Sequence, residues 1–152
     1  MLAVTETHLA GEGEIVLDEC RGYKMLFAGR KDGRAAEGVG LALTPHAWAA
    51  LRHYQPVSPR MLVAEFLTQM GPLSVVVVYA PTNQSTVEDK EQFYSDLDGV
   101  VSRTSGLTMV MGILMQLLER VGSREPSTRW ANKDLLVGEE CVGDAKSIHT
   151  GK

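Results

Sequence analysis

Short apolar runs separated by polar, glycine-rich stretches dominate the first 112 residues of the chain. Four consecutive valines occupy positions 75–78, and an unbroken run of β-branched residues is typical of a strand buried on both faces. Other short apolar or alternating runs are bounded by glycine, proline and polar residues, as strands usually are. The pattern predicts strands over residues 2–4, 23–28, 39–43, 61–67, 75–79 and 107–111.

Two segments carry helix signals instead. Thr86-Val87-Glu88-Asp89 matches a capping box, in which a threonine and an acidic residue satisfy the first backbone amides of a helix. This helix should run to about Arg103, because apolar residues recur at helical spacing: Phe93, Leu97, Val100 and Val101. Thr44-Pro45 predicts a short helical turn through Leu51. Residues 29–38 and the segment that contains Pro56 and Pro59 are expected to be loops.

The order of these elements predicts an α/β protein of the α+β type with mixed β-sheets, because strands outnumber helices and do not alternate with them. The pattern changes after Gly112. Residues 113–121 have the spacing of a short amphipathic helix, whereas residues 122–152 have little periodicity and many small polar and charged side chains. We therefore expect one domain in residues 1–112 and a poorly ordered tail in residues 113–152.

Composition narrows the class of protein. With 152 residues, 44% of them hydrophobic, the chain is long enough for one domain with one core. Its net charge of −4 argues against nucleic-acid binding through bulk positive charge, although a local basic rim such as Arg30, Lys31 and Arg34 remains compatible with an enzyme that acts on a phosphate backbone. Solvated loop residues are the alternative interpretation of that rim.

The remaining bulk features predict an intracellular protein, nuclear or cytoplasmic. The two cysteines, Cys20 and Cys141, lack zinc-site spacing. They permit one disulfide but do not indicate it, so we expect a reduced intracellular chain. The N-terminal residues have no basic segment of the kind found in signal peptides. The longest apolar run, residues 73–80, is too short to span a membrane, so we expect no membrane association.

Few residues stand where chemistry is expected. Glu6 follows a predicted strand, and a carboxylate held there is a suitable oxygen ligand for Mg²⁺, although a solvated loop acid is the simpler interpretation. Tyr79 ends the valine strand, where its hydroxyl can donate to a phosphate oxygen or simply contact water. Thr82 and Asn83 follow, as phosphate contacts or as turn residues. His8 is a possible base or an exposed loop histidine.

Taken together, these segments resemble a known family. Val4-Thr5-Glu6-Thr7-His8 resembles the strand-end "ETH" motif of the endonuclease/exonuclease/phosphatase superfamily, and residues 78–82 are similar to its "YAP" motif. Residues 39–43 look like its glycine-led strand, and residues 108–112 look like the strand before its "GDFNA" motif. The resemblance covers residues 1–112, and it is strongest to the endonuclease domains of non-LTR retrotransposons and the craniofacial-development-protein-like sequences derived from them.

The resemblance implies a fold and an activity. The family fold is a four-layer α/β sandwich of two packed mixed sheets, of which this chain would form a truncated part. The family hydrolyses phosphodiesters or phosphomonoesters with Mg²⁺ or Mn²⁺, which neutralises developing charge during in-line attack. By resemblance Glu6 is the metal ligand and a catalytic residue, Tyr79 holds the phosphate, and Thr82 and Asn83 bind substrate. The implied partner is DNA, and no protein partner is evident.

The chain departs from the family pattern in ways that predict impaired catalysis. We expect the strand that precedes the "ETH" strand in the family, and its asparagine ligand, to be absent. After Gly112 stand Ile113-Leu114-Met115-Gln116 instead of Asp-Phe-Asn-Ala, and the family's C-terminal aspartate and histidine are missing. The alternatives to an active endonuclease are therefore a non-enzymatic remnant and an unrelated small α/β binding or adaptor protein.

A frameshift would explain this junction. Isoleucine codons begin with AT, so one G restored before the codon for Ile113 creates an aspartate codon, and alanine then replaces Gln116. On this hypothesis residues 113–152 are translated out of frame, and the coding sequence decides it. A splice difference is the alternative cause of such a junction.

Overall fold

The computed structural model describes residues 1–34, 36–82, 84–113 and 135–138. Their strands form two sheets. The four-stranded sheet has the order β1-β4-β3-β2, and all its described pairings are antiparallel. Its strands are β1 (Leu2–Thr5), β2 (Glu12–Asp18), β3 (Tyr23–Ala28) and β4 (Val39–Leu43).

The five-stranded sheet has the order β5-β6-β7-β8-β9 and is mixed. Antiparallel pairs join β5, β6 and β7, whereas β7 and β8, like β8 and β9, run parallel. Its strands are β5 (Leu51–Ser58), β6 (Met61–Thr68), β7 (Gly71–Tyr79), β8 (Leu107–Ile113) and β9 (Leu135–Gly138). The parallel step from β7 to β8 is made by helix α2 (Val87–Arg103), and the short helix α1 (Pro45–Ala50) leads from β4 into β5.

One hydrophobic core lies between the two sheets. Residues of β3 and β4 face residues of β6 and β7 there: Leu26, Ala28, Val39, Leu41, Leu43, Leu62, Ala64, Phe66, Val75, Val77 and Tyr79. A second core lies on the other face of the five-stranded sheet, where α2 packs with Phe93, Leu97, Val100 and Val101. The four valines of β7 alternate between these cores, so the strand is buried on both faces as predicted.

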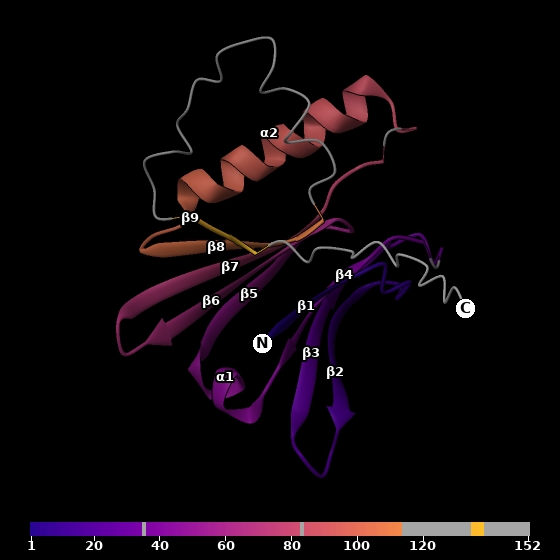
Figure 1. Cartoon of the computed structure of the whole chain (residues 1–152). Helices are drawn as coiled ribbons and strands as arrows, with labels where there is room; N and C mark the ends of the chain where they lie inside the picture. Colours follow the sequence, from indigo (N-terminus) through magenta and orange to yellow (C-terminus); the bar gives the residue numbers. More distant parts are fainter. Residues whose placement is uncertain (35, 83, 114–134, 139–152) are drawn as a thin grey trace, which may run out of the picture.

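The described residues thus form three layers, α2, the five-stranded sheet and the four-stranded sheet (Figure 1). The predicted α+β class with two packed sheets is confirmed. Within the described ranges, no helix covers the outer face of the four-stranded sheet, so the arrangement is a partial form of a four-layer sandwich.

Both helices begin where their caps were predicted. The Thr86 hydroxyl accepts from the backbone amide of Asp89 at 3.1 Å, and α2 ends at Arg103. The Thr44 hydroxyl accepts in the same way from Ala47, and Pro45 follows at the first helical position. These local hydrogen bonds satisfy amides that have no partner within the helix.

One predicted loop contains a strand, and a segment without a predicted element forms another. Strand β5 includes Pro56 and pairs with β6 from the edge of its sheet, where the missing proline amide leaves no gap in an inner ladder. Strand β2 carries charged residues and pairs with β3, also from an edge. The five-stranded sheet also extends past the predicted boundary at residue 112, because β8 includes Ile113 and β9 lies in the segment 113–152. The short helix predicted for residues 113–121 falls, beyond Ile113, outside the described residues.

Candidate functional site

The two predicted catalytic residues meet, although 73 positions separate them. Glu6 follows the last residue of β1, and Tyr79 is the last residue of β7. The Tyr79 hydroxyl donates to Oε1 of Glu6 at 2.5 Å, a distance typical of a hydrogen bond to a charged carboxylate. The contact forms because β1 packs across β7 and β8, and the Tyr79 ring belongs to the core between the sheets.

Tyr79 is held as a neutral phenol. Its pKa is raised above the ordinary value of 10.0, mainly because the hydroxyl donates to Glu6, then because the ring is buried and because Glu6 is negatively charged nearby. The positive charge of Arg60 acts in the opposite direction. At neutral pH Tyr79 is therefore a hydrogen-bond donor that orients the carboxylate of Glu6.

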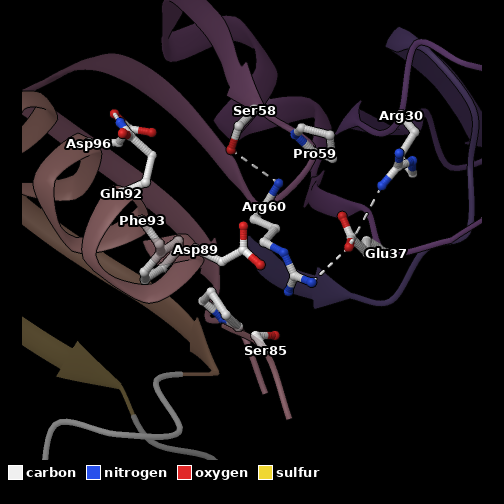
Figure 2. Close-up of a pocket in the computed structure, with 11 residues that line it drawn as sticks. Arg30, Glu37, Ser58, Pro59, Arg60, Ser85, Asp89, Gln92, Phe93 and Asp96 are labelled. Atoms are coloured by element: carbon white, nitrogen blue, oxygen red, sulfur yellow. Dashed lines mark hydrogen bonds and ion pairs between the residues drawn. The ribbon is translucent and has the colours of Figure 1, made fainter. Parts of the chain in front are cut away.

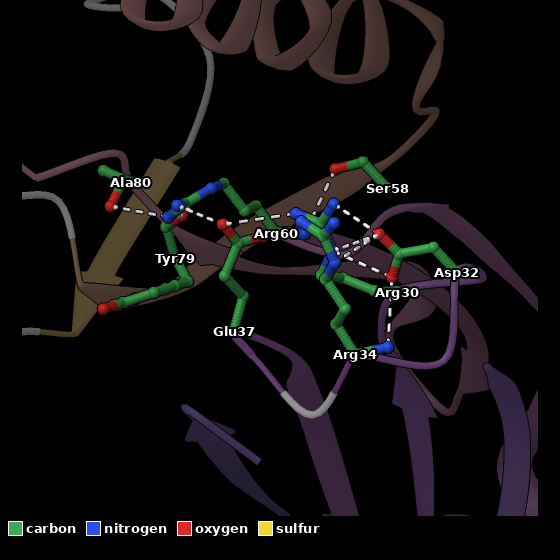
Figure 3. Close-up of polar contacts among 8 residues, drawn as sticks. All are labelled: Arg30, Asp32, Arg34, Glu37, Ser58, Arg60, Tyr79 and Ala80. Atoms are coloured by element: carbon green, nitrogen blue, oxygen red, sulfur yellow. Dashed lines mark hydrogen bonds and ion pairs between the residues drawn. The ribbon is translucent and has the colours of Figure 1, made fainter. Parts of the chain in front are cut away.

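Arg60 connects Tyr79 to the loop before β4. It lies in the short turn between β5 and β6, and its Nη2 donates to Oε1 of Glu37 at 2.7 Å. Its Nη1 donates to the backbone carbonyls of Tyr79 and Ala80, both at 3.4 Å. The guanidinium carbon also lies 5.1 Å from the centre of the Tyr79 ring, within the range of a cation–π contact. Figure 3 shows these contacts.

The predicted basic rim is largely paired with acids. Arg30 donates to both carboxylate oxygens of Asp32, with a closest distance of 2.7 Å, and these bonds lower the pKa of Asp32 below its ordinary value of 3.8. Arg34 lies 3.7 Å from Asp32 (Figure 3). Lys31 lies 3.1 Å from Glu12. The rim thus carries less free positive charge than its sequence indicates.

A polar pocket of about 370 Å³ opens beside Arg60. Its lining combines two arginines with three acids and several neutral groups: Arg30, Glu37, Ser58, Pro59, Arg60, Pro81, Ser85, Asp89, Gln92, Phe93 and Asp96. In Figure 2 the Arg60 guanidinium lies between Glu37 and the α2 residue Asp89. Arg60 lines this pocket and also contacts the face of the Tyr79 ring, so it lies between the pocket and the Glu6–Tyr79 pair.

Unusual backbone conformations concentrate at this site. In the described part of the chain, the non-glycine residues with positive φ are Glu6, His8 and Glu37, at 56°, 52° and 63°. A non-glycine residue in this region costs roughly 1–2 kcal/mol. The segments also bond to each other, since the amide of His8 donates to the carbonyl of Glu37 at 2.9 Å. Strain of this kind clusters at functional sites.

Thr7 packs closely against the start of β4. A Cβ added at Gly38 would collide with the Thr7 hydroxyl, and one added at Gly40 would lie 3.3 Å from the Thr7 methyl group. Gly38 also has a φ of +105°. These two glycines therefore allow the segment after β1 to lie against β4, which places Glu6 at the end of its strand.

The described residues contain no cluster of ligand side chains that could enclose a divalent cation. Within them, no group of three or more histidine, cysteine, aspartate or glutamate side chains is placed to hold a metal ion. Mg²⁺ sites commonly use one or two carboxylates together with water and substrate phosphate. Glu6 therefore fits a cation that is shared with a bound phosphate, and it does not form a closed metal cage.

Ile113 occupies a position next to this site. It pairs with Tyr79 in the β7–β8 ladder, and its carbonyl accepts from the amide of Ala80 at 2.9 Å. Its side chain is 40% exposed. A residue at this position thus lies beside Tyr79, the residue that donates to Glu6.

The structure says little about substrate binding by Thr82 and Asn83. Thr82 is exposed, and its carbonyl accepts from the amide of Ser85 at 3.0 Å in the turn that leads to α2. Asn83 lies outside the described residues. The sequence reasoning also missed Arg60 and Glu37, because both were taken as loop residues and neither belongs to a motif that was recognised.

No family model matches this chain, and no curated protein matches it either. In the described residues, no helix is both long and apolar enough to cross a membrane.

Proposed function

We propose that this chain carries part of the site of a divalent-metal-dependent phosphodiester hydrolase of the DNA endonuclease type, and that its own catalysis is impaired. One observation supports the proposal above the others. Glu6 and Tyr79, chosen because they resemble two family motifs far apart in sequence, share a 2.5 Å hydrogen bond where β1 and β7 end. A chance resemblance gives no reason for these two side chains to meet.

Glu6 and Tyr79 have different roles in this proposal. Glu6 would hold Mg²⁺ or Mn²⁺, and Tyr79 orients its carboxylate through Oε1. The cation would neutralise charge that develops on a phosphate of the DNA backbone.

The proposed impairment of catalysis follows from the presence of Ile113. In the motif that this segment resembles, aspartate follows the glycine, and it positions the attacking water. A hydrocarbon side chain beside Tyr79 cannot accept a proton or orient water, and the loss of such a group lowers a rate by about 10²- to 10⁴-fold.

Nicking of supercoiled plasmid with Mg²⁺ or Mn²⁺ tests the proposal. We expect slow nicking that is abolished by chelator and by Glu6→Gln, an isosteric change that removes the charge. Glu65→Gln is the matched control, because Glu65 is an exposed acid of β6 outside the site. Ile113→Asp should raise the Glu6-dependent rate by roughly ten-fold or more. Nicking that persists in Glu6→Gln would show that another site or a contaminant is responsible.

A non-enzymatic remnant, or a small α/β binding protein, is the second candidate function. The observation in its favour is that no group of three or more histidine, cysteine, aspartate or glutamate side chains in the described residues could hold a metal ion. Mn²⁺ binding followed by electron paramagnetic resonance separates the two candidates. Glu6-dependent binding supports the hydrolase origin. A cooperative thermal transition without Mn²⁺ binding, nicking or DNA binding, including in Ile113→Asp, supports the second candidate.

A further inference from the structure

Arg60 completes a closed set of contacts around the Glu6–Tyr79 pair, here called the polar ring: Glu6, His8, Glu37, Arg60 and Tyr79. The Tyr79 hydroxyl donates to the carboxylate of Glu6. His8 follows Glu6 by two positions in the chain, and its backbone amide donates to the carbonyl of Glu37. The side chain of Glu37 accepts from Arg60, which donates back to the carbonyl of Tyr79 (Figure 3).

From this ring we infer that Arg60 is a positioning residue, which sets the geometry of the Glu6–Tyr79 hydrogen bond through Glu37 on one side and the end of β7 on the other. The inference deepens the proposed function, since it concerns the same pair of residues. Its test needs neither metal nor DNA, so its failure is distinguishable from failure of that function.

The form of the arginine contact supports a positioning role. The guanidinium makes three kinds of contact at once, with a carboxylate, with two consecutive carbonyls and with the face of the Tyr79 ring. A planar fork can satisfy such a set, whereas the point charge of a lysine cannot. The two side chains are also shielded, with exposed fractions of 21% for Arg60 and 24% for Glu37, so this pair differs from the flexible ion pairs of a surface.

Backbone strain gives independent support. The three non-glycine residues that adopt positive φ in the described ranges, Glu6, His8 and Glu37, all belong to the polar ring. Strained conformations persist only where surrounding contacts over-determine them. Arg60 holds the Glu37 end of this strained segment, and Tyr79 holds the Glu6 end.

Nuclear magnetic resonance of the chain labelled with ¹³Cζ-tyrosine provides the test at neutral pH. The ¹³Cζ shift reports whether a tyrosine hydroxyl donates to a carboxylate, and Tyr79→Phe assigns the signal among the four tyrosines. Glu6→Gln should move the Tyr79 signal in the wild-type background. In the Arg60→Ala background, Glu6→Gln should no longer move the Tyr79 signal, because the Glu6–Tyr79 hydrogen bond is already misaligned. The double comparison cancels the direct effect of the arginine charge on the ring.

Further variants make the result decisive. Arg60→Lys should behave like Arg60→Ala, and Glu37→Gln should reduce the same movement while leaving the backbone unchanged. Arg52→Ala, an exposed arginine of β5, is the control that should retain it in full. Circular dichroism verifies that each variant is folded. If Glu6→Gln moves the Tyr79 signal equally with and without Arg60, or if Arg60→Lys restores the movement fully, the assignment of Arg60 is wrong.

Discussion

Tyr79 links the protonation of one side chain to the stability of the fold. Its pKa is raised in the folded chain, whereas in the unfolded chain it returns towards 10.0. The folded state therefore holds the phenolic proton more tightly. The corresponding stability is fully present below about pH 10 and is lost as pH rises through the folded-state pKa.

We predict that Tyr79→Phe removes this part of the alkaline loss of stability. Urea unfolding of both proteins from about pH 9 to about pH 11 measures it, because this range includes the titration of an unperturbed tyrosine. The free energy of unfolding should decline more steeply with pH in the wild type than in Tyr79→Phe. Parallel declines would show that Glu6 does not raise the pKa of Tyr79.

At the residue scale, two residues that the sequence analysis singled out lie in contact, whereas their catalytic and metal-binding roles stay predictions. Glu6 and Tyr79 were chosen because each stands at a strand end within a motif, and the structure places them in contact. Arg60 and Glu37 were missed because their roles depend on partners 19 to 23 positions away. A side chain whose partners lie on other strands leaves no local pattern in the sequence.

At the scale of elements, the strands that were missed are edge strands. An inner strand is buried on both sides, so its apolar run is visible, as in the valines of β7. Strands β2 and β5 each pair on one side within the described sheets, and their sequences include acids and Pro56. Backbone hydrogen bonds with a neighbour decide such strands, and side-chain patterns do not report them.

The β7–β8 ladder depends on Gly112. Its φ is +129°, and an added Cβ would collide with the carbonyl oxygen of Val78 in the neighbouring strand. Gly112→Ala should therefore lower the free energy of unfolding by about 3 kcal/mol or more, from backbone strain and overpacking together. Chemical denaturation measures this loss.

Gly71→Ala is the matched control for the ladder. Gly71 has a similar φ of +113°, but nothing lies within 4 Å of an added Cβ. Only the backbone strain applies, so the loss should be about 1 kcal/mol. Equal losses in the two variants would mean that close approach of β8 to β7 contributes nothing.

For the whole molecule, stability rests on the core between the sheets. Phe66 is 2% exposed within that core, whereas the next residue of β6, Leu67, is 53% exposed. We expect Phe66→Ala to lower the free energy of unfolding by about 3–5 kcal/mol, because it leaves a cavity between the sheets.

Leu67→Ala should change the same quantity by no more than about 0.5 kcal/mol, as is usual for exposed positions. Thermal and urea unfolding of both variants give the comparison. Similar losses at the two positions would contradict the packing of the four-stranded sheet against the β6 face that carries Phe66.

The sequence alone determined the α+β class, the inner strands and both helix starts, and motif resemblance singled out Glu6 and Tyr79. The class, the strands and the helix starts depend on local chemistry, namely apolar periodicity and capping hydroxyls. Only the tertiary structure decided the edge strands β2, β5 and β9, the order of strands in each sheet, the pairing of the basic rim with acids and the polar ring around Arg60. Such features arise from contacts between distant segments, whose partners are chosen when the two sheets pack together.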